Sequence, residues 1–385
     1  MSPDAGLRAL RDAIDELDEQ ILSQILKRGH IVQQIMALKG SLGLDAFDPQ
    51  RETEILGRLT AARTQPFDPG QVKAIFKAIF HASLDLKDRE RWQQLQVKRR
   101  DLVPQEGIMV GGVAVGTGGP VLFVGPCSVE TPQQMDAIAS FISTLPGKKI
   151  LRGGAFKPRT SPYAFQGLRE KGLQILQETG QRHGLATVTE VLDVSTLDVV
   201  AAHTDMLQIG ARNMSNTELL KAVGGAGKPV LLKRGFMSTL EELLLAAEYI
   251  VSSGNSAVVL CERGIRTFEP WTRNTLDIAA VPLLKQETSL PVIVDLSHSL
   301  GRTDIMLACA RAALAAGADG LMMEAHATPE LALSDGFQQL DCEGLRRLVA
   351  GLGIGDAADQ ATSRERAAGA QRNPSAQSAS AGGPS

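Results

Sequence analysis

Apolar residues recur at every third or fourth position over the first 98 residues, which is the spacing of an amphipathic helix. The first run of this pattern predicts a helix that ends near Lys39, before the turn at Gly40–Gly43. Two more helices are expected to begin at Asp48 and Asp68, because each aspartate can cap a helix whose first residue is the following proline. The pattern therefore predicts an all-α domain of three helices over residues 1–98.

The apolar stripe of the first predicted helix is too long for two shorter helices to cover. It comprises Leu7, Leu10, Ile14, Leu17, Ile21, Ile25, Val32 and Ile35. Such a helix is stabilised mainly by packing of its apolar face. We therefore expect a second copy of the chain to cover the stripe, which predicts a homodimer through this domain.

From residue 121 onward the chain alternates between short, almost continuously apolar runs and helical stretches, as parallel strands buried on both faces do. The eight runs are Val121–Val124, Lys149–Leu151, Ala186–Thr189, Met206–Ile209, Val230–Leu232, Ala257–Leu260, Val292–Val294 and Gly320–Met323. Eight strand–helix units over about 230 residues predict a (β/α)8 TIM barrel, with an open doubly wound sheet as the alternative.

These patterns divide the chain into a helical domain (1–98), a linker with a Gly-rich hairpin (99–120), a barrel (121–353) and a tail (354–385). We expect the hairpin to close the bottom of the barrel. The tail is rich in Ala, Ser, Gly, Gln and Arg, and it has too few large apolar groups to offset the entropy of ordering. We therefore expect it to be disordered.

Composition narrows the class of protein. The 385 residues are 43% hydrophobic and 22% charged, with a net charge of −3, which gives no case for a nucleic-acid partner. The first ten residues lack the apolar core of a signal peptide, and no apolar run is long enough to span a membrane. Four cysteines are too few for a disulfide framework in a chain of this length, so we expect a reducing, cytoplasmic setting.

Metal-binding residue types follow three of the predicted strands. Cys127 follows the first strand, His298 the seventh and Glu324 the eighth, and Asp335 lies just beyond. In a closed barrel these strands are neighbours whose C-terminal ends share one rim, where active sites lie. A thiolate, an imidazole and two carboxylates on one arc predict a site for a divalent transition metal. The alternative is a buried structural thiol at Cys127 and a core histidine at His298.

The opposite arc of the rim is cationic, with Arg152, Lys157, Arg159, Arg212, Lys233 and Arg263. Cations inside an apolar barrel are costly unless anions meet them, and arginine suits bidentate contact with phosphate. One or two of them are expected to pair with Glu190, Glu262 or Asp295. Arg234 points to the other side of its strand and is expected to be structural.

Six ordered motifs at these strand ends resemble those of the 3-deoxy-D-arabino-heptulosonate 7-phosphate (DAHP) synthases, which are related to the octulosonate 8-phosphate synthases. The motifs are Gly125–Ser128, Arg152–Ser161, Gly210–Asn213, Leu231–Gly235, Asp295–His298 and Leu333–Gly336. The sequence from Lys157 to Ser161 is similar to the version that binds erythrose 4-phosphate. A synthase of the octulosonate type remains the alternative.

The resemblance implies condensation of phosphoenolpyruvate with erythrose 4-phosphate and release of inorganic phosphate. It implies a metal ion, Mn²⁺ first with Fe²⁺, Co²⁺ or Zn²⁺ as alternatives, that polarises the aldehyde oxygen and is held by Cys127, His298, Glu324 and Asp335. It assigns phosphoenolpyruvate to Arg152, Lys157, Arg212, Lys233 and Arg263, and erythrose 4-phosphate to Arg159, Thr160 and Ser161. Lys157 is the candidate proton donor to the aldehyde oxygen, and Glu190 is the candidate that positions a water.

Polar residues also interrupt the apolar stripe of the first helix. Arg28 lies on the stripe, and Lys39 is eleven residues further on, about 20° away around the helix. Arg11 precedes Arg28 by 17 residues, roughly 25 Å along the axis. One small ligand can therefore meet both only if Arg11 comes from a second subunit.

This spacing resembles the all-helical chorismate mutases, which occur alone and fused to DAHP synthases. The resemblance implies that chorismate or prephenate is bound by Arg11, Arg28, Lys39, Asp48, Arg51, Glu52, Ser83 and Lys87. The rearrangement of chorismate to prephenate would need charge stabilisation rather than acid–base chemistry. Lys87 departs from the family, which usually has Gln or Glu near this position.

Other readings of the helical domain stay open. The domain is a regulatory module that senses chorismate or prephenate and inhibits the barrel, or Arg28 and Lys39 are merely salt-bridged or extended to solvent. The expected partners are these small molecules and further copies of the chain, with a tetramer through the barrel as an additional option. No membrane partner is expected.

Overall fold

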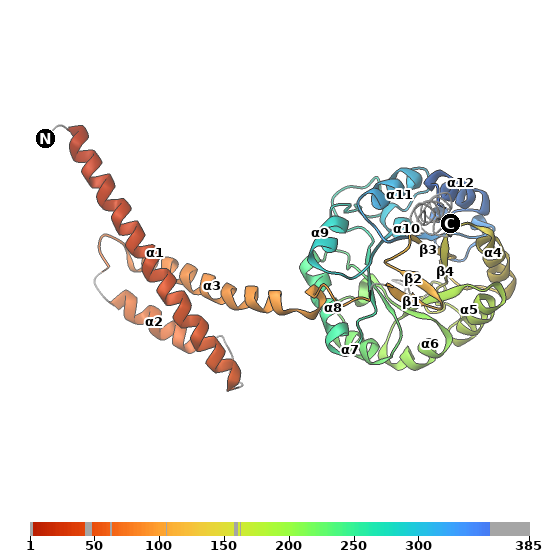
Figure 1. Ribbon diagram of the computed structural model, residues 1–385, viewed down its shortest axis with the longest axis horizontal. Coiled ribbons are helices and arrows are strands. Elements are labelled where there is room, and N and C mark those ends of the chain that lie inside the picture. The colour runs from red at the N-terminus through yellow and green to blue at the C-terminus, as the bar shows by residue number, and fades with distance from the viewer. Residues whose placement is uncertain are drawn as a thin grey trace, which may run out of the picture. The chain divides into compact units, whose positions relative to one another are not determined.

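The computed structural model describes residues 3–42, 48–61, 64–104, 106–157, 161 and 163–354. It divides into two compact units, residues Met1–Leu95 and Gln96–Ser385, of which the first is helical and the second contains a barrel (Figure 1). The tail from residue 355 onward, which the sequence predicts to be disordered, lies outside the described residues. No described helix combines the length and the apolar character that crossing a membrane requires.

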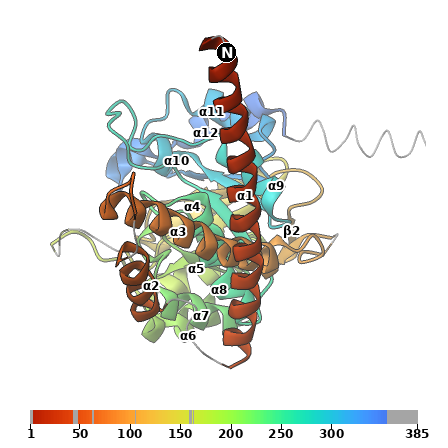
Figure 2. The ribbon, with the colours of Figure 1, turned by 90° about the vertical axis from the view of Figure 1, so that its left-hand side faces the viewer.

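The described residues of the first unit form three helices, as predicted: α1 (Pro3–Ser41), α2 (Pro49–Ala61) and α3 (Pro69–Gln94). Asp68 caps α3 by accepting from the backbone N–H groups of Gly70 and Gln71, and the side chain of Gln71 accepts in return from the N–H of Asp68. Asp48 accepts from the N–H of Arg51 in the same way at the start of α2. Figure 2 shows α1 as one continuous helix with α3 packed across it.

The apolar stripe of α1 is uncovered within this unit. Leu10 is 67% exposed, Ile14 57% and Ile21 54%, and of the described side chains of α1 only Met36 is buried. Contacts of α1 with α3 leave the outer part of the stripe in solvent. A row of exposed leucines and isoleucines of this length is a typical feature of a surface that another chain covers.

The second unit is a closed barrel of parallel strands in the order β10-β3-β4-β5-β6-β7-β8-β9, so the predicted barrel is confirmed and the open sheet is wrong. The strands are β3 (Val121–Gly125), β4 (Lys148–Arg152), β5 (Ala186–Val191), β6 (Met206–Ile209), β7 (Val230–Lys233), β8 (Val258–Glu262), β9 (Val292–Asp295) and β10 (Gly320–Glu324). They are almost entirely buried, because helices surround the barrel on all sides (Figure 1).

The surrounding helices follow the strands in sequence. They are α4 (Pro132–Thr144), α5 (Glu170–His183), α6 (Leu197–His203), α7 (Thr217–Gly225), α8 (Leu240–Ser252), α9 (Ala280–Glu287), α10 (Leu296–Leu300), α11 (Met306–Ala315) and α12 (Cys342–Leu352). Several strands extend one or two residues beyond the predicted end, so that a polar residue such as Arg152, Lys233 or Glu324 occupies the last strand position. The polar rim residues are therefore held by the barrel backbone itself.

A hairpin closes the opposite end of the barrel. It consists of the antiparallel strands β1 (Ile108–Val110) and β2 (Val113–Val115), and its apolar residues join the buried cluster that fills the barrel. Gly111 in its turn has a φ of +50° and lies so close to β5 that a Cβ would come within 2.7 Å of the Cβ of Ala186. The hairpin packs against the N-terminal end of the barrel, and the cavity described below lies at the opposite, C-terminal rim.

Candidate active site at the barrel rim

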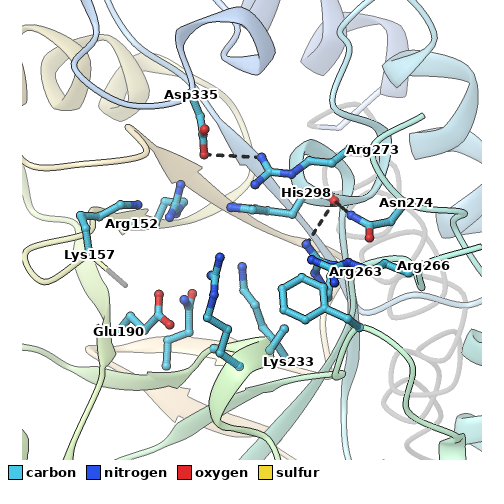
Figure 3. A pocket seen from close by; sticks show the side chains of 15 residues that line it. Arg152, Lys157, Glu190, Lys233, Arg263, Arg266, Arg273, Asn274, His298 and Asp335 are labelled. Atoms are coloured by element: carbon cyan, nitrogen blue, oxygen red, sulfur yellow. Dashed lines mark hydrogen bonds and ion pairs between the residues drawn. The ribbon is translucent and has the colours of Figure 1, made fainter. Parts of the chain in front are cut away.

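A cavity of about 290 Å³ opens at the C-terminal ends of the strands. Among the described residues, seven cationic side chains line it: Arg152, Lys157, Arg212, Lys233, Arg263, Arg266 and Arg273. Figure 3 shows Asp335 and His298 on one side of this cavity and Glu190 and Lys233 on the other. Residues that lie up to 183 positions apart in sequence, from Arg152 to Asp335, thus surround one space.

Three of the four predicted metal ligands form a group on one side. The ligand atoms of Cys127, Glu324 and Asp335 all lie within 4.8 Å of one another. The fourth, His298, has its Nε2 atom 3.5 Å from Oε1 of Glu324. Sulfur, imidazole nitrogen and carboxylate oxygen form a donor set that suits a divalent transition metal, so the residues fit the ion that the sequence predicts.

The thiol of Cys127 is buried among polar groups. Its Sγ lies 2.8 Å from Oγ of Ser334, 3.0 Å from Nζ of Lys157 and 3.5 Å from Oδ2 of Asp335. Burial, together with the charge of Glu324, raises the pKa of Cys127 to about 11, and the nearby Lys157 opposes the change. A cation at this position would favour the thiolate instead.

His298 is oriented by Asp295, the last residue of β9 and the N-cap of α10. Asp295 accepts from the backbone N–H of His298 at 3.0 Å, and its other oxygen lies 2.9 Å from Nδ1 of the ring. Nε2 is thereby left on the side of Glu324. Burial lowers the pKa of His298, which favours the neutral imidazole that binds metals, although the charge of Asp295 opposes the shift.

Asp295 is itself fully buried and also accepts from Nζ of Lys233. Burial alone would raise the pKa of Asp295, but His298 and Lys233 hold it well below its usual range. From the sequence, Asp295 is expected only as a counterion of the cations, and its contact with His298 is not predicted. The signal that could have revealed it is an N-cap aspartate three residues before a histidine.

Glu324 is held by two donors. Nη1 of Arg152 lies 2.6 Å from Oε1, and Nε2 of Gln338 lies 2.5 Å from Oε2. Burial would raise the pKa of Glu324, but His298 and Arg152 bring it below its usual range, so the carboxylate is ionised. Gln338 was missed by the sequence analysis, because it lies in a loop that follows no strand directly.

On the cationic side, Arg152 and Lys233 pair with the carboxylates of Glu324 and Asp295, whereas Arg263 has no carboxylate contact among the described residues. Arg263 is only 3% exposed and donates to the carbonyl oxygens of Gly264 and His298 at 3.4 and 3.3 Å. Burial lowers its pKa. A buried guanidinium without a counterion indicates a place for an anionic ligand.

Glu190 also lines the cavity, from the end of β5. Gly210, at the end of the next strand, makes room for it, because a Cβ on Gly210 would come within 1.9 Å of Oε1 of Glu190. A side chain at position 210 would therefore displace the carboxylate of Glu190 from its present position. Arg234 faces away, as expected, and pairs at 2.9 Å with both Glu262 and Asp277.

Not every predicted residue can be placed. Arg159 and Thr160 lie outside the described residues, and Ser161 is exposed and does not line the cavity. Conversely, Phe236, Arg266, Arg273 and Asn274 line it although the sequence analysis did not select them. The last three come from the long loop after β8, several residues beyond the motif at the end of that strand.

A separate cavity of about 400 Å³ lies in the helical unit. Six of the eight residues predicted to bind chorismate or prephenate line it: Arg28, Lys39, Asp48, Arg51, Glu52 and Ser83. Arg28 donates to Oγ of Ser83 at 2.6 Å and lies 4.8 Å from the centre of the Phe80 ring. Arg11 is exposed and does not line this cavity, and the side chain of Lys87 lies outside the described residues.

Two family models match the chain, one over each unit. The model of the DAHP synthetase I family matches residues 93–352, and that of chorismate mutase type II matches residues 10–88. A phospho-2-dehydro-3-deoxyheptonate aldolase of Thermotoga maritima is 53% identical over 251 residues, which are 65% of this chain and 74% of that protein. A 2-dehydro-3-deoxyphosphooctonate aldolase of Pelobacter propionicus is 32% identical over 269 residues, 65% of this chain and 97% of that protein.

Solved structures agree with these matches. The crystal structure of the Thermotoga maritima phospho-2-dehydro-3-deoxyheptonate aldolase has a TM-score of 0.62 at 51% identity, covering 67% of this chain and 75% of that one. A truncated form of 3-deoxy-D-arabino-heptulosonate 7-phosphate synthase from the same organism has a TM-score of 0.62 at 47% identity, covering 69% of this chain and 97% of that one.

Proposed function

The chain belongs to the DAHP synthetase I family and also has a chorismate mutase type II domain, and from this premise we propose two activities for its two cavities. The barrel condenses phosphoenolpyruvate with erythrose 4-phosphate and releases inorganic phosphate. The helical domain converts chorismate to prephenate, senses these compounds to regulate the barrel, or does both. The octulosonate alternative is not favoured, since the family match and the higher identity both point to the heptulosonate enzymes.

One observation carries the proposal for the barrel: two proposed metal ligands, His298 and Asp335, line the same cavity of about 290 Å³ as the cations. The ligand atoms of the buried Cys127 and Glu324 lie within 4.8 Å of that of Asp335, directly behind this side of the cavity. Phosphoenolpyruvate has a phosphate and a carboxylate, and Arg152, Lys157, Arg212, Lys233 and Arg263 supply donors for both. Arg263 supports this assignment most directly, because it is buried without an ion pair among the described residues, and an anionic ligand would offset much of the free energy cost of its burial.

Cys127, His298, Glu324 and Asp335 would hold the metal ion, with Mn²⁺ favoured and Fe²⁺, Co²⁺ or Zn²⁺ as alternatives. When bound, the ion would supply Lewis-acid polarisation of the aldehyde of erythrose 4-phosphate. Arg159, Thr160 and Ser161 remain the proposed contacts of the aldose phosphate. Holding both substrates in one narrow cavity supplies proximity between the C3 atom of phosphoenolpyruvate and the aldehyde carbon.

The protein's own residues account for the remaining steps. As C3 attacks the aldehyde carbon and forms the new C–C bond, Nζ of Lys157 can donate a proton to the aldehyde oxygen. Lys157 is held for this by its contacts with the carbonyl oxygen and Sγ of Cys127 at 2.9 and 3.0 Å. Glu190 would position the water that adds to C2, after which the C2–O bond to phosphate breaks and inorganic phosphate leaves.

In the helical domain, Arg28, Lys39 and Arg51 would hold the two carboxylates of chorismate, and Asp48, Glu52 and Ser83 would complete the site. Arg11 of a second subunit and Lys87 are the remaining proposed contacts. The cavity supports this proposal because it combines three cations with apolar walls formed by Val32, Ile35 and Ile55. The exposed stripe of α1 supports a dimer, in which each subunit could supply Arg11 to its partner.

A phosphate-release assay with the full chain tests the barrel. We expect release to require both phosphoenolpyruvate and erythrose 4-phosphate, to stop after treatment with EDTA and to return with Mn²⁺. Arabinose 5-phosphate in place of erythrose 4-phosphate should give little release, and prephenate in the same assay tests regulation. Release that survives chelation would remove the metal from the proposal, and efficient use of arabinose 5-phosphate would favour the octulosonate alternative.

A further inference from the structure

Three guanidinium groups surround the ring of Phe236. Cζ lies 4.5 Å from the ring centroid for Arg266, 4.7 Å for Arg263 and 5.5 Å for Arg212. All four residues line the barrel cavity, and Figure 3 shows Arg263 and Arg266 on one side of it. Two of these arginines, Arg212 and Arg263, are proposed ligands of phosphoenolpyruvate, whereas Phe236 has no role in the mechanism described above.

The cluster has an electrostatic problem before the substrate arrives. None of the three guanidinium groups pairs with a carboxylate among the described residues, and Arg263 is almost completely buried. Three positive charges that lie around one ring repel one another, so each side chain would tend to turn away from the cavity. The negative face of an aromatic ring attracts a guanidinium, and it is the available partner here.

Phe236 is itself firmly positioned. It follows β7 by three residues, its carbonyl oxygen accepts from the N–H of Arg266 at 2.7 Å, and the N–H of Gly235 lies 3.0 Å from Sδ of Met214. The backbone thus ties the loop after β7 to the loop after β8. The backbone of Phe236 is therefore held against the loop that carries Arg263 and Arg266.

From this arrangement we propose that Phe236 is a positioning residue for substrate binding: its ring holds Arg212 and Arg263 in the conformations that receive phosphoenolpyruvate. The inference rests on the proposed function of the barrel. A guanidinium that lies against a ring uses its face for that contact, and its N–H edge stays available for bidentate contact with phosphate or carboxylate. The contact with the ring thus offsets part of the conformational entropy that these side chains lose, before the substrate binds.

Substitution of Phe236 separates this role from that of a simple apolar wall. Phe236→Leu and Phe236→Met keep an apolar side chain and remove the ring, and Phe236→Tyr keeps the ring. In the full-length, Mn²⁺-loaded enzyme we expect the first two to raise KM and the calorimetric Kd for phosphoenolpyruvate about tenfold. The kcat should change less than about twofold, because the interaction is lost equally from ground state and transition state. Phe236→Tyr, which keeps the ring, should retain the wild-type KM and Kd for phosphoenolpyruvate.

The chain offers a matched control, since Arg346 lies 5.0 Å from the ring centroid of Phe141, and neither residue lines the cavity. Phe141→Leu should leave both constants for phosphoenolpyruvate unchanged. The proposal is overturned if the KM for phosphoenolpyruvate is unchanged in Phe236→Leu and Phe236→Met. It is also overturned if these variants lose kcat and the KM values for both substrates stay the same. If Phe236→Leu does not fold, as judged by circular dichroism, the comparison of Phe236→Met with Phe236→Tyr decides. A wild-type enzyme that releases no phosphate refutes the proposed function itself, and the inference with it.

Discussion

Lys157 donates hydrogen bonds to two atoms of Cys127, its carbonyl oxygen at 2.9 Å and its Sγ at 3.0 Å. One residue was assigned to phosphoenolpyruvate and the other to the metal, so the contact joins the two halves of the proposed site. It places an ammonium group beside the atom that would bind the metal. The proposed phosphoenolpyruvate and metal sites should therefore be coupled, so that a substitution in one site alters binding at the other.

Cys127→Ala should abolish metal binding and turnover together, because the thiolate is the only sulfur donor among the four proposed ligands. We expect bound metal, measured by mass spectrometry of the dialysed protein, to fall below about one tenth of the wild-type content. Phosphate release should fall by about a hundredfold or more. Cys309→Ala is the control, since Cys309 is not part of the group formed by Cys127, Glu324 and Asp335. Full metal content in Cys127→Ala would mean that the thiol is structural.

Asp295→Asn should weaken the metal site without removing a ligand. His298 would lose the carboxylate that orients its ring, which typically lowers metal affinity about tenfold to a hundredfold. Lys233 would lose its buried counterion, at a cost of about 3 kcal/mol in the free energy of unfolding. Titration with Mn²⁺ and urea denaturation measure the two effects.

The control for Asp295→Asn is Asp304→Asn, because Asp304 forms an exposed ion pair with Arg302 at 2.6 Å. Exposed pairs contribute little to stability, so this variant should retain both properties. Wild-type metal affinity in Asp295→Asn would show that the orientation of His298 does not depend on the carboxylate.

The barrel and its rim could be predicted because each strand end follows a buried apolar run directly. Cys127, Arg152 and Glu324 lie within two residues of such ends, so closure of the barrel alone brings them together. Gln338 and Arg273 lie in long loops, whose paths depend on tertiary contacts such as the bond from Arg273 to Gln338 at 2.6 Å. Nothing in the local sequence pattern specifies that contact.

The exact ends of the strands also depend on tertiary contacts that the local sequence pattern does not specify. The sequence predicts a strand that ends at Leu151, and β4 continues to Arg152 because Arg152 is anchored by Glu324, 172 residues away. A polar residue at the end of an apolar run is ordinarily a sign that the strand has ended. A partner distant in sequence reverses that preference, and only the closed barrel reveals the partner.

Arg28→Gln should disable the helical domain and spare the barrel. Arg28 lines the helical cavity and donates to Ser83 at 2.6 Å, so the substitution removes a cation from the proposed carboxylate site. We expect chorismate turnover, followed by loss of its absorbance, to fall by about a hundredfold. Inhibition of phosphate release by prephenate should be lost as well, if the domain is a sensor. The exposed Arg8 on the same helix provides the control Arg8→Gln.

The outcomes of Arg28→Gln distinguish the remaining alternatives for this domain. Loss of both chorismate turnover and inhibition by prephenate supports one site that catalyses and regulates. Loss of inhibition in a chain whose wild type has no mutase activity supports a purely regulatory module. Unaltered turnover and inhibition would mean that Arg28 is structural and that the cavity binds no dicarboxylate.

The exposed stripe of α1 yields a prediction about assembly. Ile14 and Ile21 are 57% and 54% exposed, and they lie seven residues apart on one face of α1. Ile14→Glu with Ile21→Glu should introduce buried like charges if this face is a dimer interface. We expect the molar mass from light scattering to fall to that of a smaller assembly, with no loss of helical content by circular dichroism.

The same double variant tests whether the helical site is shared between subunits. Arg11 is about 25 Å from Arg28 along the helix axis, so one chain cannot bring both to a small ligand. Dissociation should therefore remove chorismate turnover even though every residue that lines the cavity is intact. Asp15→Lys, on an exposed position of the same helix, controls for a change of charge. A dissociated variant that retains full turnover would show that Arg11 has no part in the site and that each helical domain acts alone.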